Sequence, residues 1–214
     1  MKRFNAMMQL LLTISLLIAS CSSSQKQEVK NGQDTTVSPD NVLIVYLSRT
    51  ANTQAIAEII QANVGGKMVA MELLNPYPEN YQATVRQVAD ENRRGYLPPL
   101  KTKIDSMEKY DVVFVGFPTW GMQLPPPMKS FLKQYDLRNK TVVPFNTNGG
   151  YGIGSSFQTV KELCPNSNVL EGFTIRGGSE RDGVLLAIKD EKRREAESKV
   201  KEWLQTLKLM NRTP

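Results

Sequence analysis

Residues Asn41–Thr53 read NVLIVYLSRTANT, and this segment sets the architecture expected for the whole chain. It begins with a continuous apolar run, Val42 to Leu47, and then becomes polar before a helical pattern starts. A short run that is apolar on both faces is typical of a central strand in a parallel sheet, because crossover helices cover both faces of such a strand. The polar residues are therefore expected at the carboxyl end of this strand, directly before a helix.

These polar residues predict an anion-binding site. At a junction of strand, turn and helix, backbone N–H groups and the positive end of the helix dipole converge on one point. Hydroxyl groups and an amide add further donors, so the predicted ligand is a phosphate. The candidate residues are Ser48, Arg49, Thr50, Ala51, Asn52 and Thr53. The alternative is an ordinary turn in which Asn52 or Thr53 caps the helix.

The rest of the chain continues the alternation of strands and helices. Apolar runs predict further strands at 67–74, 112–117, 141–145 and 169–175, with helical periodicity between them. The second helix is marked by Tyr81, Val85, Val88 and Ala89 and is expected to end near Gly95. Five strands that alternate with five helices predict an α/β sheet with right-handed crossovers.

Two later loops also hold residues suited to binding, and each follows a predicted strand. Pro118, Thr119, Trp120 and Gly121 follow the third strand, and a loop with four glycines follows the fourth. Ligands on α/β sheets bind at the carboxyl ends of strands, where the winding direction reverses. A tryptophan in such a loop offers an apolar surface, although a large core side chain at the sheet edge is the alternative.

The segment after the first strand resembles the phosphate loop of flavodoxins, Ser/Thr-x-Thr-Gly-Asn-Thr, with Ala51 where glycine is usual. The loop around Trp120 resembles that of a flavodoxin subfamily in which the tryptophan covers the flavin. The likeness extends over about residues 42–207 and points to a lipoprotein-containing branch of the flavodoxin-like family. It implies a three-layer sandwich, with a five-stranded parallel sheet in the order 2-1-3-4-5 and helices on both faces. In this order the three loops are neighbours.

The resemblance implies that these loops bind flavin mononucleotide (FMN) without a covalent bond. The first loop would hold the phosphate, and Trp120 would stack on the ring. The fourth-strand loop would bring backbone N–H groups to the pyrimidine end of the ring, and Tyr151 would pack on its outer face or remain a surface aromatic. The candidates there are Thr147, Asn148, Gly149, Gly150, Tyr151 and Gly152. If Ala51 requires a positive φ, its Cβ costs roughly 1–2 kcal/mol.

The N-terminal residues are expected to lie outside the domain. Lys2 and Arg3 precede an apolar stretch that ends in Ile18-Ala19-Ser20-Cys21, which has the regions of a secretory signal. Its end resembles a bacterial lipobox, which implies removal of residues 1–20 and a lipid on Cys21; a buried N-terminal helix is the alternative. Residues 21–40 are polar without periodicity and predict a flexible tether. The domain is then expected at 41–209, with a short tail at 210–214.

The resemblance to a lipobox implies a protein of the cell envelope, anchored to a membrane through lipid on Cys21, on the periplasmic or outer-membrane side. Its 27 basic and 21 acidic residues give a formal net charge of +6. This excess is modest and has no interleaved aromatic pattern, so a nucleic-acid partner is not expected.

The composition also restricts the chemistry. Histidine is absent, which excludes Ser-His and Cys-His triads and histidine metal sites. With Cys21 lipidated, Cys164 is alone, so neither an intramolecular disulfide nor a cysteine metal cluster is expected. Any redox chemistry must therefore come largely from a cofactor.

The sequence thus predicts an FMN-binding redox protein that transfers electrons to an unidentified partner or reduces a small acceptor such as a quinone. Whether it is an enzyme or a carrier stays open. The alternative from another class is an exported binding module with the flavodoxin fold and no redox turnover. A third, weaker alternative is binding or hydrolysis of a phosphate ester at the same loop. Flavin content after purification separates the first two.

Overall fold

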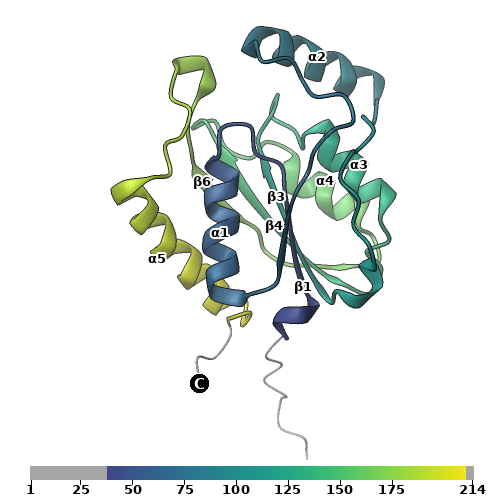
Figure 1. The fold of residues 1–214 in the computed structure, drawn as a ribbon, viewed down its shortest axis with the longest axis vertical. Coiled ribbons are helices and arrows are strands. Elements are labelled where there is room, and N and C mark those ends of the chain that lie inside the picture. The colour runs from purple at the N-terminus through teal and green to yellow at the C-terminus, as the bar shows by residue number, and fades with distance from the viewer. Residues whose placement is uncertain (1–37, 211–214) are drawn as a thin grey trace, which may run out of the picture. The chain divides into compact units, whose positions relative to one another are not determined.

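A parallel sheet forms the centre of the computed structural model, which describes residues 38–210 (Figure 1). The strands are β1 (Val42–Tyr46), β2 (Lys67–Ala70), β3 (Val112–Pro118), β4 (Thr141–Asn148), β5 (Asn168–Val169) and β6 (Phe173–Arg176). They pair in the order β2-β1-β3-β4-β5, and β6 also pairs with β4. The expected order 2-1-3-4-5 is confirmed, with the fifth strand divided in two.

Helices cover both faces of this sheet. They are α1 (Asn52–Val64), α2 (Tyr81–Arg94), α3 (Pro126–Gln134), α4 (Ser156–Leu163) and α5 (Asp190–Thr206), with short 3-10 turns η1 (Pro39–Asn41), η2 (Met107–Lys109) and η3 (Glu180–Asp182). Helices α1 and α5 pack on one face, and α3 and α4 on the other. Within residues 38–210, no helix has the length and apolar character to cross a membrane.

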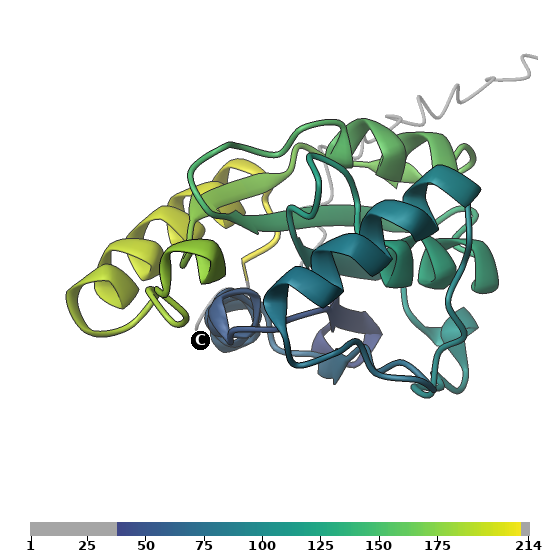
Figure 2. The same ribbon diagram turned by 90° about the horizontal axis from the view of Figure 1, so that it is seen from above.

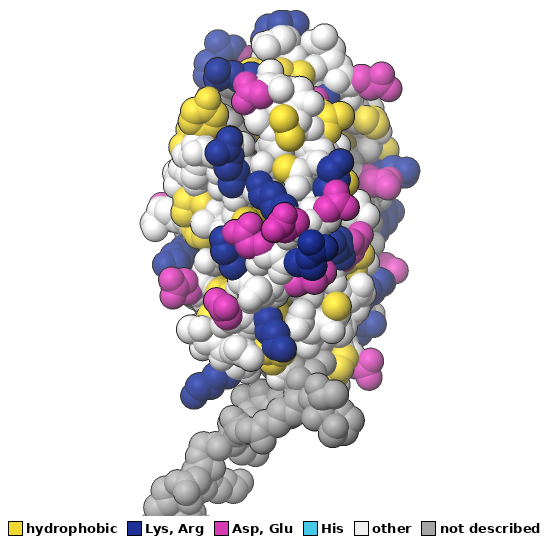
Figure 3. All heavy atoms as spheres, turned by 90° about the vertical axis from the view of Figure 1, so that its left-hand side faces the viewer, with side chains coloured by type: hydrophobic (Ala, Val, Ile, Leu, Met, Phe, Trp, Pro, Cys, Tyr) yellow, Lys and Arg dark blue, Asp and Glu magenta, His cyan; other side chains and the backbone are white. Residues whose placement is uncertain are grey.

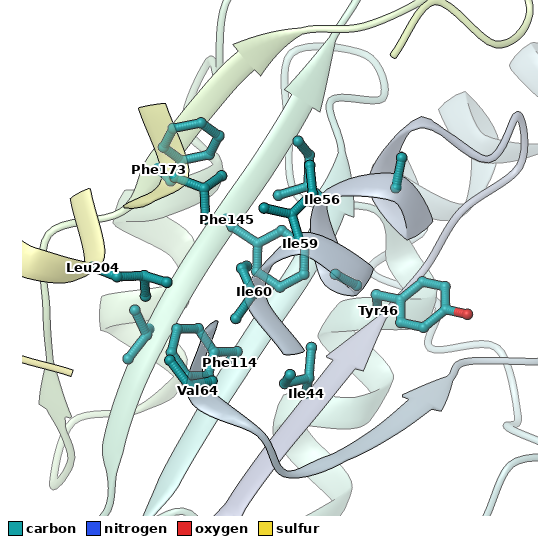
Figure 4. Packing of buried hydrophobic residues seen from close by; sticks show 14 of the residues in the cluster. Ile44, Tyr46, Ile56, Ile59, Ile60, Val64, Phe114, Phe145, Phe173 and Leu204 are labelled. Atoms are coloured by element: carbon teal, nitrogen blue, oxygen red, sulfur yellow. The ribbon is translucent and has the colours of Figure 1, made fainter. Parts of the chain in front are cut away.

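The two core clusters follow from the alternation of side chains along the strands. In β1, Ile44 faces α1, whereas Leu43 and Val45 face α3 and α4. Figure 4 shows the first cluster, in which Phe114 and Phe145 of the sheet lie against the isoleucines of α1. All of these side chains are fully buried, as a central parallel sheet requires.

The surface of the α1 and α5 layer carries charges of both signs side by side (Figure 3). Arg193 of α5 lies 3.1 Å from Glu58 of α1 and 3.4 Å from Glu197. Lys199 pairs with Glu195 at 2.5 Å, as expected for an i, i+4 pair. Exposed pairs of this kind contribute little to stability, so the buried face of α5 holds the helix in place.

Proline explains why the strand expected at 169–175 is broken. The gap between β5 and β6 lies opposite Val143 and Pro144 of β4, because Val142 pairs with Val169 and Phe145 with Phe173. A proline offers no N–H to a neighbouring strand, so pairing on that side stops there. The strand expected at 67–74 also ends early, at Ala70.

Helix α2 has a different place from the other helices. It lies beyond the carboxyl ends of the strands rather than on a face of the sheet (Figure 1), and Figure 2 looks down on it from that side. The corresponding sheet face is covered instead by a segment that includes Ile104, Met107 and Tyr110. Helix α2 therefore lies above the carboxyl edge of the sheet, where the sequence predicts the site.

Candidate functional site

The turn from β1 to α1 presents a row of backbone donors. Ala51 adopts the left-handed conformation, with φ 61° and ψ −1°, and helix α1 begins at Asn52. The N–H groups of residues 49–53 bond to no atom within the described part of the chain, and Ser48 Oγ accepts from the N–H of Gln54 at 3.2 Å. Free N–H groups at a helix N-terminus are the geometry of an anion site. The alternative assignment of Asn52 or Thr53 as the N-cap is wrong, because Ala51 holds that position.

The side chains of Asn52 and Thr53 connect this turn to other loops. Asn52 donates to the carbonyl of Leu185 at 2.6 Å and accepts from the N–H groups of Ala187 and Ile188. The Thr53 hydroxyl lies 2.9 Å from that of Thr147, at the end of β4. Both residues are buried. Their side chains thus position the turn, and their backbone N–H groups remain for a ligand.

Arg49 joins three loops at the mouth of the site. Its Nε donates to both carboxylate oxygens of Glu180, at 3.0 and 2.8 Å, and its terminal nitrogens donate to the carbonyls of Pro78 and Glu79. The side chains of Arg49 and Glu180 are each only 21% exposed. The one N–H of Nε is shared between the two carboxylate oxygens, and the donations from the terminal nitrogens fix the orientation of the guanidinium plane. Arg49 therefore acts as a positioning residue between the phosphate turn, the segment before α2 and η3.

Trp120 lies at the site with its position set by backbone and aromatic contacts. The N–H of Thr119 donates to the carbonyl of Thr147 at 3.0 Å, and the Thr119 hydroxyl donates to the carbonyl of Gly152 at 2.9 Å. The ring of Tyr77 meets the indole edge to face, with centroids 5.4 Å apart. Trp120 is half-buried and packs against the core, as one of the two alternatives from the sequence expected, and it also lines a cavity at this site.

Tyr77 is itself held by a buried carboxylate. Its hydroxyl donates to Glu91 of α2 at 2.5 Å, and Glu91 is 2% exposed. Burial, together with this hydrogen bond, raises the pKa of Tyr77 well above its usual value. The phenol thus stays protonated, and it links α2 to the Trp120 loop.

The loop after β4 is organised by Asn148. Its Oδ1 accepts from the N–H groups of Gly150 at 2.9 Å and Gly152 at 3.2 Å. The resemblance implies that this loop offers N–H groups to a flavin. The N–H groups of Gly150 and Gly152 are instead engaged within the loop. Tyr151 is 65% exposed, and its hydroxyl accepts from Arg181 at 3.3 Å.

The three loops share one cavity of about 240 Å³. The predicted residues that line it are Arg49, Thr50, Asn52, Thr53, Pro118, Thr119, Trp120, Thr147, Asn148, Gly149 and Tyr151. Gly121 lines the adjoining cavity under α2, and Ser48 lines a third cavity on the other side of Trp120. Ala51, Gly150 and Gly152 shape the loops without lining these cavities.

Part of the cavity wall comes from residues that the sequence did not single out. These are Tyr81 at the start of α2 and the segment Gly178–Arg181 after β6. The sequence signal that could have indicated this segment is the pair Gly177-Gly178. A Cβ on Gly178 would lie 1.9 Å from the carbonyl oxygen of Leu185, so only glycine fits there. Within residues 38–210 there is no cluster of acidic or cysteine side chains that could hold a metal ion.

Comparison with known proteins gives a consistent result. The family model described as flavodoxin matches residues 41–190. A solved structure from Bacteroides eggerthii, described as a candidate flavoprotein, is 28% identical over 78% of this chain and 96% of its own, with a TM-score of 0.62.

Two further structures show similarity of fold. A candidate flavoprotein from Bacteroides uniformis is 23% identical over 75% of this chain and 97% of its own, with a TM-score of 0.57. A flavoprotein from Lactobacillus acidophilus, solved in complex with FMN, is also 23% identical, over 68% of this chain and 98% of its own, with a TM-score of 0.57.

Proposed function

The chain belongs to the flavodoxin family, and on this premise we propose that it is an FMN-binding redox protein whose cofactor lies in the cavity shared by the three loops. The family match supports the cofactor predicted from the sequence. The observation that carries the proposal is that one cavity is lined by Trp120, by Tyr151 and by four residues of the turn with free N–H groups, Arg49, Thr50, Asn52 and Thr53.

The residues present fit this cofactor. Unpaired N–H groups at the start of α1, together with the helix dipole, suit a phosphate and need no cation. Arg49 is already engaged by Glu180, so the phosphate would be held mainly by backbone groups and by the hydroxyl of Thr50. The aromatic side chains of Trp120 and Tyr151 offer flat apolar surfaces for the ring.

When bound, FMN supplies one- or two-electron redox chemistry. The protein's own residues provide binding, orientation and exclusion of water. Thr119 fixes the backbone that carries Trp120, and Trp120 shields one side of the cavity. Because the sequence has no histidine, the side chain most often used as a general acid or base is absent from this site.

We propose in addition that the electrons pass to a small acceptor such as a quinone. A cavity with apolar side chains next to the cofactor cavity supports this view. The basic excess supports it too: 27 basic and 21 acidic residues give +6, and 25 and 21 give +4 without Lys2 and Arg3, whereas a carrier that docks on basic partners is expected to be acidic. The competing function is a binding module of the same fold without redox turnover. Ala51, strained in the left-handed region where flavodoxins have glycine, favours that alternative because it would weaken the phosphate turn.

The first test is a visible absorbance spectrum of the purified chain before and after addition of FMN, together with tryptophan fluorescence. The chain has two tryptophans, which allows a matched pair of variants. FMN is expected to quench the emission of Trp203→Phe, which retains Trp120, and to leave that of Trp120→Phe almost unchanged. Trp120→Ala is expected to weaken FMN binding about tenfold. Absence of binding at micromolar concentrations would refute the redox proposal and favour the binding module.

We also propose that the protein is exported and anchored through lipid on Cys21, with residues 1–20 removed and 21–40 as a tether. Residues 1–37 and 211–214 lie outside those that the structure describes, so this proposal is supported by the sequence pattern alone. The mass of the N-terminal peptide from membranes tests it: a diacylglyceryl group is expected on Cys21, and Cys21→Ala should release the protein from the membrane. An unmodified N-terminus that still includes Met1 would refute it.

A further inference from the structure

A second cavity lies between helix α2 and the Trp120 loop. Its volume is about 420 Å³, within the range of small-molecule sites. It shares Thr119 and Trp120 with the proposed cofactor cavity, so the two spaces adjoin. Its other wall is α2, which contributes only Tyr81 to the cofactor cavity.

Apolar side chains lie on both sides of this second cavity, among polar ones. Helix α2 contributes Val85, Val88 and Ala89, and the loop side contributes the indole of Trp120. Val85 is 42% exposed although it belongs to the apolar face of its helix. Small aliphatic side chains and an indole suit a ring system that is apolar on its faces.

One end of the cavity carries hydrogen-bond donors of defined orientation. Lys129 Nζ donates to the side-chain oxygen of Asn92 at 2.8 Å and to that of Gln123 at 3.3 Å. The amino groups of both amides are therefore the ends left to donate, and neither has an acceptor among residues 38–210. Both residues line the cavity. Burial lowers the pKa of Lys129, as expected for an ammonium group without a carboxylate beside it.

The ion pair of Arg49 and Glu180, at the other end of the cavity, leaves no unpaired charge there for an ionic ligand. Arg49 and Glu180 also line the cavity, but each neutralises the other at 2.8 Å. Arg93, the third charged residue of the lining, pairs with Asp90. Because the charged side chains are paired within the protein, the cavity suits a largely apolar ligand with an acceptor oxygen at the edge that meets the two amides.

We propose that the cavity under α2 binds a flat, largely apolar carbonyl compound of the quinone class, with the side-chain amides of Asn92 and Gln123 donating to one of its carbonyl oxygens. This inference rests on the proposed redox function, because it places the electron acceptor beside the cofactor. Helix α2 is then the element that determines which acceptor the protein takes.

Equilibrium dialysis of menadione (2-methyl-1,4-naphthoquinone) against the FMN-saturated protein tests the proposal. Val85→Asp is expected to weaken binding at least tenfold, because it places a carboxylate in the apolar wall. Leu97→Asp is the matched control: Leu97 is 41% exposed, lies just beyond α2 and lines none of the described cavities, so its change should leave binding as it was.

A second comparison tests the amide donors. The ligand 2-methylnaphthalene has the same ring system without the carbonyl oxygens. Gln123→Leu is expected to weaken menadione binding about five- to tenfold and to leave 2-methylnaphthalene binding unchanged. Equal losses for both ligands would show that Gln123 acts through shape alone and would overturn the assigned hydrogen bond.

Two results would overturn the site as a whole. One is equal binding of menadione by the natural chain and by Val85→Asp. The other is loss of menadione binding when FMN is added, because the cavity would then belong to the cofactor. The flavin spectrum is recorded before any menadione is added. If the chain takes up no FMN, the proposed function fails; if it takes up FMN and either result above is seen, only the menadione site fails.

Discussion

The Ala51→Gly variant is expected to be more stable than the natural chain. Ala51 has φ 61° and ψ −1°, in the left-handed region where a Cβ costs roughly 1–2 kcal/mol. Glycine removes this cost but loses about 0.4–1 kcal/mol, because the unfolded chain gains conformational freedom. The free energy of unfolding is therefore expected to rise by about 0.5–1 kcal/mol.

Helix α1 offers a matched control for this change. Ala62 is exposed in the same helix, where the same substitution is expected to lower the free energy of unfolding by about 1 kcal/mol. The two variants should thus differ by about 1.5–2 kcal/mol, with opposite signs relative to the natural chain.

Urea unfolding followed by far-ultraviolet circular dichroism measures both variants. Equal slopes against urea would allow the midpoints to be compared directly as stabilities. If Ala51→Gly lost as much stability as Ala62→Gly, the strain assigned to Ala51 would be refuted. Ala51 would then give no cause for weak phosphate binding at this turn.

Two further predictions concern the core. Gly116→Ala is expected to cost about 1–3 kcal/mol in urea unfolding, because the added Cβ would lie 2.1 Å from the buried ring of Phe145, and an unchanged midpoint would contradict this packing. Burial raises the pKa of the Cys164 thiol to about 11 from the usual 9.0, so the unfolded chain releases this proton first and stability should fall as the pH rises from about 9 to 11. The fall is at most about 1.4 kcal/mol per pH unit; Cys164→Ala should show a smaller fall over the same window, and equal falls would contradict the assignment.

The strands of the sheet could be predicted because their evidence is local: each central strand appears as an apolar run, and the alternation with helices indicates parallel pairing. The order of the strands was implied by the resemblance of the loops to those of flavodoxins. At Ala51 the sequence provides only a condition, since glycine is usual at this position in flavodoxins, and the structure supplies the conformation, with φ 61°.

Features that depend on pairing between distant segments could not be predicted. Pro144 was visible, but its consequence falls on the neighbouring strand, where β5 and β6 separate. The ion pair of Arg49 with Glu180 joins residues 131 positions apart, and neither residue type indicates its partner. The phosphate motif places Arg49 in the turn after β1, but its role as a link between loops appears only in three dimensions.

For helix α2, periodicity predicts the helix but not where the helix packs. The apolar positions Val85 and Val88 predict an amphipathic helix, and such a face normally packs on a sheet. Here both ends of the helix are held elsewhere: Arg49 binds the carbonyls of Pro78 and Glu79 just before it, and Lys129 of α3 binds Asn92 near its end. Val85 consequently remains 42% exposed, which forgoes the roughly 25 cal/mol per Å² that burial of apolar surface would contribute. Polar contacts at both ends keep this helix above the sheet, and its apolar surface faces a cavity. Binding of an apolar ligand in that cavity would bury this surface and contribute the missing stabilisation.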